Sequence, residues 1–103
     1  EETVILMTGE FGRTPKINGN AGRDHWNGCY SLMLLGGGFQ QELLYGLSDE
    51  TGAYPARDPL TPGDIIATIY HALGVPHDGL VYDPTDRPHR IVPNGEPIPA
   101  LLS

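Results

Sequence analysis

The run Thr3–Met7 (TVILM) constrains the fold more than any other part of the sequence. It is short, apolar at consecutive positions and rich in β-branched residues, and it ends at Thr8-Gly9. Apolar residues on both faces are typical of a strand buried inside a parallel sheet. Such a strand needs a neighbour on each side, and the chain opens on it. We therefore expect an α/β fold in which this chain is one part of a larger domain.

Two further segments are predicted to be regular. Tyr30–Leu35 (YSLMLL) is a second apolar run, closed by three glycines, and is interpreted as another buried strand. Arg90–Val92 is predicted to be a short strand before a turn. Residues 9–28 are interpreted as one long polar loop, and loops of that length are usually functional or disordered. The order of strand, loop, strand, loop, helix and short strand favours the α/β class.

The best-marked element is a helix from about Pro62 to Leu73. Thr61 is a suitable N-cap, Pro62 suits the first helical position, and Asp64 lies in the first turn. Gly74 is a typical residue just beyond a helix end. The apolar residues that recur at helical spacing predict one packed stripe, which comprises Ile65, Ile66, Ile69, Tyr70 and Leu73.

Composition narrows the possible partners. The 103 residues carry a net charge of −7 without any cluster of Lys or Arg, which argues against binding to nucleic acid or to an anionic membrane surface. No apolar run approaches the roughly 20 residues of a membrane span. Gly 14 and Pro 10 indicate a loop-rich structure. Cys29 is the only cysteine, so no internal disulfide can form.

Chemistry is first suggested just after the first apolar run. Glu10 and Arg13 follow it in the segment TGEFGRTP, and ligands of parallel α/β sheets bind beyond the carboxyl ends of the strands. The alternative is a surface loop with a Glu–Arg pair of little energetic value. The local spacing by itself favours that alternative slightly.

A second cluster is Gly22-Arg23-Asp24-His25-Trp26. A carboxylate beside an imidazole can bind a metal ion or transfer protons. The alternative is a structural hydrogen-bonded pair. Trp26 could form a wall of a site, although packing in the core is the better interpretation. No HxH, HExxH or CxxC spacing links the remaining histidines, so a self-contained zinc site is not expected.

The motifs TGEFGRTPKIN, GRDHW, LTPGDIIATIYHALGV and DRPHRIVPNGEPIPALL together cover nearly the whole chain. In this order the chain resembles the C-terminal region of the bacterial domain-of-unknown-function family fifteen hundred and one. That family is related to the alkaline phosphatase and sulfatase superfamily. The resemblance implies that residues 1–103 are the C-terminal part of a single domain. It further implies a three-layer α/β/α fold with a mostly parallel sheet, whose N-terminal part lies outside this chain.

The resemblance also implies roles for individual residues. In that superfamily a strand ends in a Thr-Ala-Asp-His-Gly-like segment whose Asp and His bind metal; here Glu10 keeps a carboxylate, but Phe11 replaces the histidine. A later ligand histidine matches His25, and Asp24 is implied as a ligand or as a partner that orients His25. Arg13 and Arg23 are implied as groups that offset oxyanion charge.

The implied activity is metal-dependent hydrolysis of a phosphate or sulfate ester. The cofactor would be a divalent ion such as zinc, calcium, magnesium or manganese, and the substrate a small anionic ester. The nucleophile is expected outside this chain, so the chain alone should be inactive, and the remainder of its own domain is the expected partner. The alternative is a non-catalytic binding or structural relative whose metal site has eroded, which Phe11 favours. Export to the periplasm or the cell exterior is implied by the resemblance.

Overall fold

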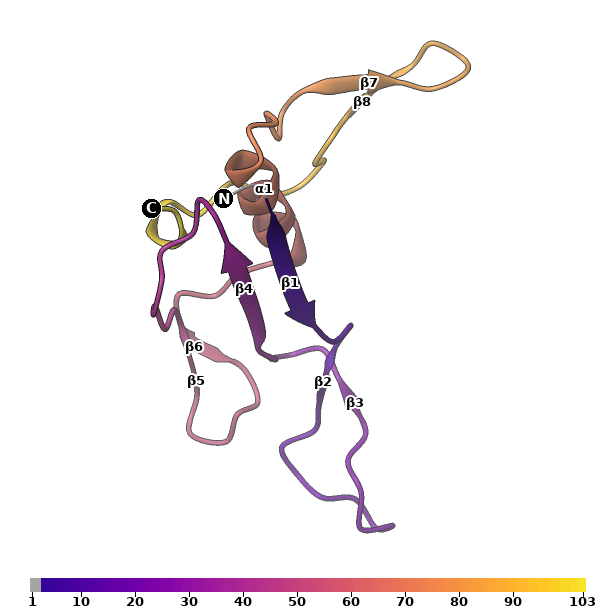
Figure 1. Cartoon of the computed structure of the whole chain (residues 1–103). Helices are drawn as coiled ribbons and strands as arrows, with labels where there is room; N and C mark the ends of the chain where they lie inside the picture. The colour runs from indigo at the N-terminus through magenta and orange to yellow at the C-terminus, as the bar shows by residue number, and fades with distance from the viewer. Residues whose placement is uncertain (1–2) are drawn as a thin grey trace. The chain divides into compact units, whose positions relative to one another are not determined.

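The computed structural model describes residues 3–103 (Figure 1). These residues divide into two compact units. Of the described residues, the first unit contains 3–5, Leu35–Leu43 and Leu60–Ser103, and the second contains Leu6–Leu34 and Leu44–Pro59. None of the helices in residues 3–103 has the length and hydrophobicity that crossing a bilayer requires.

Short strand pairs make up most of the regular structure. β1 (Val4–Thr8) pairs with β4 (Leu32–Gly36), and their arrows run in opposite directions in Figure 1. Three further pairs are antiparallel hairpins. They are β2 (Gly12–Arg13) with β3 (His25–Trp26), β5 (Leu47–Ser48) with β6 (Pro55–Arg57), and β7 (Leu80–Tyr82) with β8 (Pro88–Arg90).

The prediction of a mostly parallel three-layer α/β/α sheet is therefore wrong. Parallel strands need a crossover connection of a dozen or more residues, usually a helix. In the described part of the chain the only α-helix, α1 (Pro62–Ala72), lies between two hairpins and connects no parallel pair. The long loop predicted for residues 9–28 contains the β2–β3 hairpin, and the strand predicted for Arg90–Val92 is displaced toward β8.

The helix prediction is confirmed in detail. The Thr61 hydroxyl accepts a hydrogen bond from the Asp64 backbone N–H at 3.2 Å, and the Asp64 carboxylate accepts one from the Thr61 N–H at 3.0 Å. This reciprocal capping box satisfies donors that a helix start leaves unpaired. At the other end Gly74 adopts φ +80°, and Val75 N–H donates to the Tyr70 carbonyl, as in a Schellman motif.

The buried face of α1 differs from the predicted stripe. Ile65 is buried as expected, but Ile66 and Leu73 are 41% and 50% exposed. Ala67 and Thr68 are fully buried instead. With Ile65, the other buried apolar side chains of the first unit are Phe39, Val92 and Ile98.

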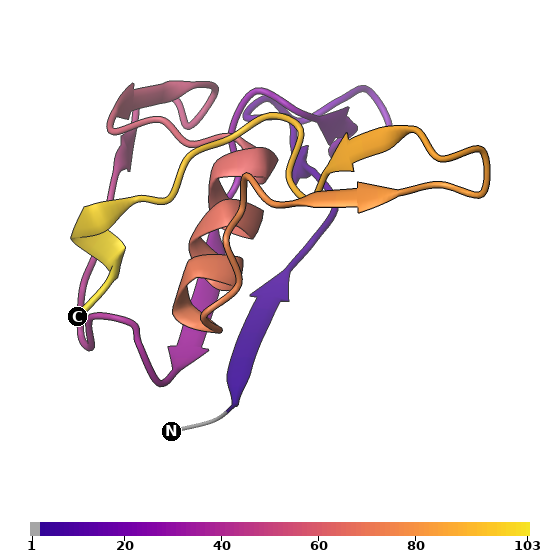
Figure 2. The same cartoon turned by 90° about the horizontal axis from the view of Figure 1, so that it is seen from above.

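The C-terminal segment is held to the first unit by hydrogen bonds. Ile98 N–H donates to the Thr68 hydroxyl at 3.0 Å, and Ser103 N–H donates to the Gly38 carbonyl at 3.1 Å. The chain ends in a short 3₁₀ helix, Pro99–Leu101, shown at the yellow end of Figure 2. These hydrogen bonds satisfy backbone N–H groups that a terminal segment would otherwise leave to solvent.

Many large apolar side chains of the strands are exposed. In β1, Ile5 and Met7 are 50% and 60% exposed, and in β4 Met33 is 51% exposed. The apolar side chains of β1 and β4 are thus only partly covered by other residues of this chain. That residues 1–103 form only part of a larger domain stays a prediction.

Candidate functional site

The β2–β3 hairpin carries most of the residues predicted from the sequence. Arg13 lies directly opposite His25, and Gly12 lies opposite Trp26. Side chains that face each other across an antiparallel pair project from the same face. Phe11 precedes Arg13 by two positions and lies against His25, with ring centroids 4.1 Å apart and the planes tilted by 34°. The hairpin thus gathers Phe11, Arg13 and His25.

The Arg13 guanidinium lies beside this aromatic pair. Its Cζ is 5.8 Å from the centroid of the Phe11 ring, within the range of a cation–π contact. One guanidinium N–H donates to the Arg23 carbonyl at 3.3 Å. A guanidinium has five N–H donors, so this bond leaves others for a ligand. Arg13 and His25 are both exposed and lie opposite each other in the register of the hairpin.

Asp24 and Arg23 stabilise the loop of the hairpin. The Asp24 carboxylate accepts a hydrogen bond from the Asn18 amide at 3.0 Å. The Arg23 guanidinium donates to the carbonyls of Thr14 and Pro15 at 2.9 and 2.8 Å. Adjacent residues in an extended strand point to opposite faces, so Asp24 does not share the face of His25. The roles assigned to both residues by the resemblance stay predictions.

Glu10 is exposed in the segment after β1. No three His, Cys, Asp or Glu side chains within residues 3–103 gather closely enough to hold a metal ion. Among the described residues, Glu10, Asp24 and His25 therefore do not form a complete metal site. A divalent ion bound by His25 and Glu10 would need further ligands from elsewhere, and its presence stays a prediction.

A surface hollow of about 310 Å³ opens beside the hairpin, lined by Phe11, His25, Trp26 and Asn27. Trp26 is half-buried, and its indole N–H donates to the Ala53 carbonyl at 2.7 Å. Its ring also contacts Tyr54, with centroids 5.6 Å apart. Core packing was the favoured interpretation of Trp26, whereas the structure places it in the wall of the hollow. Asn27 and Tyr54 were not predicted from sequence, because neither lies in a recognisable motif.

Two glycines allow the backbone to pack closely around Trp26. A Cβ on Gly28 would lie 2.6 Å from the Trp26 Nε1 and 2.6 Å from the Ala53 carbonyl oxygen. A Cβ on Gly12 would collide with the Cys29 carbonyl. The missing side chain of Gly12 therefore lets the backbone of β2 approach the Cys29 carbonyl closely.

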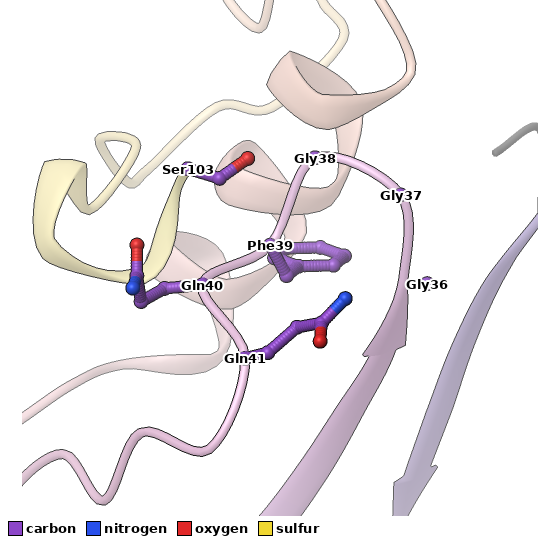
Figure 3. Close-up of a pocket in the computed structure, with 7 residues that line it drawn as sticks. All are labelled: Gly36, Gly37, Gly38, Phe39, Gln40, Gln41 and Ser103. Carbon is purple, nitrogen blue, oxygen red and sulfur yellow. The ribbon is translucent and has the colours of Figure 1, made fainter.

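A second hollow of about 500 Å³ lies at the end of β4 (Figure 3). It is lined by Gly36, Gly37, Gly38, Phe39, Gln40, Gln41 and Ser103. The Phe39 side chain is buried, and the two glutamines supply only neutral amides. No ionisable side chain lines it, so it offers fewer groups for anion or metal chemistry than the hollow beside the hairpin.

Comparison with known proteins identifies one relationship. A sequence model of the family described as "Protein of unknown function (DUF1501)" matches residues 1–102. Neither the curated proteins nor the solved structures contain a significant match.

Proposed function

The chain belongs to the DUF1501 family of proteins of unknown function, and we propose that it contributes a binding site for an anionic ester. The ligand is a phosphate or sulfate ester, and Arg13 and His25 are the pair that binds its anionic group. The observation that carries the proposal is the cross-strand register, which places Arg13 directly opposite His25.

The chemistry of the pair fits such an anion. A guanidinium presents planar, diverging N–H donors that match the oxygens of phosphate, and it remains charged at any physiological pH. An imidazole adds an N–H donor and, when protonated, a second positive charge. No acidic side chain lines the adjoining hollow. Two such donors on one face form a local exception in a chain with a net charge of −7.

The resemblance to phosphatases and sulfatases supports the choice of an ester. It rests on the segments TGEFG and LTPGDIIATIYHALGV, which resemble a strand end and a helix of that superfamily. The proposal assigns binding to this chain. Hydrolysis would require a nucleophile and further metal ligands from another polypeptide segment. Together with such a segment, the chain would form the metal-dependent hydrolase that the resemblance implies.

The test is a titration of the full chain with ethyl phosphate and ethyl sulfate, followed by the backbone amide signals of residues 11–27. Arg13→Gln and His25→Gln should each weaken binding about ten-fold, the low end expected for loss of a hydrogen bond to a charged group. Arg87→Gln is the matched control, because Arg87 is exposed in the β7–β8 hairpin of the other unit. Equal affinities in all four proteins would refute the proposal.

The hydrolase and its metal are tested separately, on a polypeptide that also includes the remainder of the predicted domain. After dialysis against zinc or manganese, the metal content of the natural protein is compared with that of its Glu10→Ala and His25→Ala variants. Less metal in both variants, together with turnover of phosphate or sulfate esters by the unaltered protein, would support metal-dependent hydrolysis. Equal metal content in all three would remove Glu10 and His25 as ligands.

A further inference from the structure

The lining of the hollow beside the β2–β3 hairpin has an unusual composition for a site that binds only a small anion. Three of its four lining side chains are flat rings, those of Phe11, His25 and Trp26, and the fourth is the amide of Asn27. Flat side chains present large apolar faces, and an amide supplies both donors and an acceptor. This combination is typical of a site for a ring with polar groups at its edge.

The tryptophan wall is fixed before any ligand arrives. The Trp26 indole is held by its hydrogen bond to Ala53 and by the Tyr54 ring, tilted by 60°. Gly28 packs against the indole so closely that any Cβ there would clash with Nε1. A side chain held in place loses little conformational freedom on binding, so less binding free energy is spent on ordering it.

The aromatic lining continues into the anion-binding pair. Phe11 and His25 belong to the lining and contact each other, and the Arg13 guanidinium lies 5.8 Å from the Phe11 centroid. A molecule that binds its anionic group to Arg13 and His25 therefore has an aromatic surface within reach of its organic part.

We propose that the ester bound here carries a flat ring, which packs against Phe11 and Trp26 while its anionic group binds Arg13 and His25. The Asn27 amide forms hydrogen bonds with polar substituents on the ring. This proposal rests on the ester-binding function above and specifies the organic part of its ligand. An aromatic ring and the C–H face of a pyranose sugar ring can both pack against an aromatic side chain, so the experiment compares both.

Trp26 is the only tryptophan of the chain, so its indole N–H gives a single side-chain signal that reports directly on the hollow. The full chain is titrated with phenyl phosphate and glucose 1-phosphate as ring esters. Ethyl phosphate serves as the ester without a ring, and phenol and methyl glucoside as rings without the ester. At least one ring ester should shift the indole signal saturably and bind about ten-fold more tightly than ethyl phosphate.

A variant separates the ring from the anionic group. Phe11→Leu keeps an apolar side chain but removes the flat face. It should weaken binding of the ring ester about three- to ten-fold, the range measured for aromatic pairs. Binding of ethyl phosphate should weaken less than binding of the ring ester, because for ethyl phosphate only the contacts of Phe11 with Arg13 and His25 are altered. Tyr82→Leu is the matched control, since Tyr82 is an exposed aromatic residue of β7 in the other unit. Its affinity for ring esters should equal that of the unaltered chain.

The outcomes distinguish failure of this proposal from failure of the proposed function. If ethyl phosphate binds as tightly as both ring esters, the proposed role of the ring is refuted, whereas the proposed binding of the anionic group by Arg13 and His25 is retained. If the neutral rings bind as tightly as the ring esters and Arg13→Gln has no effect, the aromatic surface stands and the ester function fails. Absence of any saturable shift overturns both. If Phe11→Leu does not fold, the comparison of ligands on the unaltered chain still tests whether the ring contributes to binding.

Discussion

Replacing Thr68 tests how the C-terminal segment is attached to α1. Thr68 is fully buried, and its hydroxyl donates to the Asp64 carbonyl at 2.7 Å while it accepts from Ile98 N–H at 3.0 Å. Valine has nearly the same shape but no hydroxyl. Thr68→Val therefore leaves the N–H of Ile98 without its partner, in a residue that is only 8% exposed.

The expected loss follows from these contacts. A buried donor left unpaired costs about 1–3 kcal/mol. The Asp64 carbonyl is less affected, because it lies four residues before residue 68 in α1 and accepts the helical N–H bond as well. The added methyl group recovers up to about 0.8 kcal/mol of apolar burial. We therefore expect Thr68→Val to lower the free energy of unfolding by about 1–2 kcal/mol.

Urea denaturation of the full chain measures that loss, and hydrogen exchange of the Ile98 amide locates it. Thr68→Ser is the matched control, because it keeps the hydroxyl and loses a methyl group, at a cost of about 1 kcal/mol. Ile98 exchange should quicken in the valine variant beyond what the loss of global stability explains, but not in the serine variant. Unchanged stability and unchanged Ile98 exchange in Thr68→Val would refute the reasoning.

Two further predictions concern the first unit. Hydrogen bonds from His89, Arg87 and Thr85 lower the pKa of Asp83 from 3.8 to about 2. Because the pKa in the folded state lies below that in the unfolded state, the ionised carboxylate stabilises the β7–β8 hairpin fully above about pH 3.8. This contribution is lost as the pH falls through about 2. Amide signals of the hairpin should follow this acid transition, and Asp83→Asn should flatten it; an identical profile would contradict the assignment. Gly63→Ala should lower stability by about 1–3 kcal/mol in thermal unfolding, because its Cβ would collide with the Asn94 carbonyl. Gly19→Ala is the control with open space around it, and equal melting temperatures would show that the Asn94 contact relaxes without cost.

Features that depend only on neighbouring residues could be predicted from the sequence. Thr61, Asp64 and Gly74 act within one turn of α1, so the beginning and end of the helix could be predicted. The apolar runs likewise marked β1 and β4 to within two residues, since β-propensity and turn residues are local signals.

Which strands pair and which of their faces are covered depends on contacts between distant parts of the chain. The runs of β1 and β4 were expected inside a parallel sheet, yet antiparallel hairpins dominate and much of the apolar surface of these strands is exposed. The candidate site shows the same division: the sequence singled out Arg13 and His25 separately, and only the register of β2 and β3 brings them together with Phe11. Likewise, Trp26 acquired its place in the hollow from Ala53 and Tyr54, 27 and 28 residues further along the chain. Pairing across such separations depends on closing a loop and on the fit of distant surfaces, and no local pattern of residues encodes either.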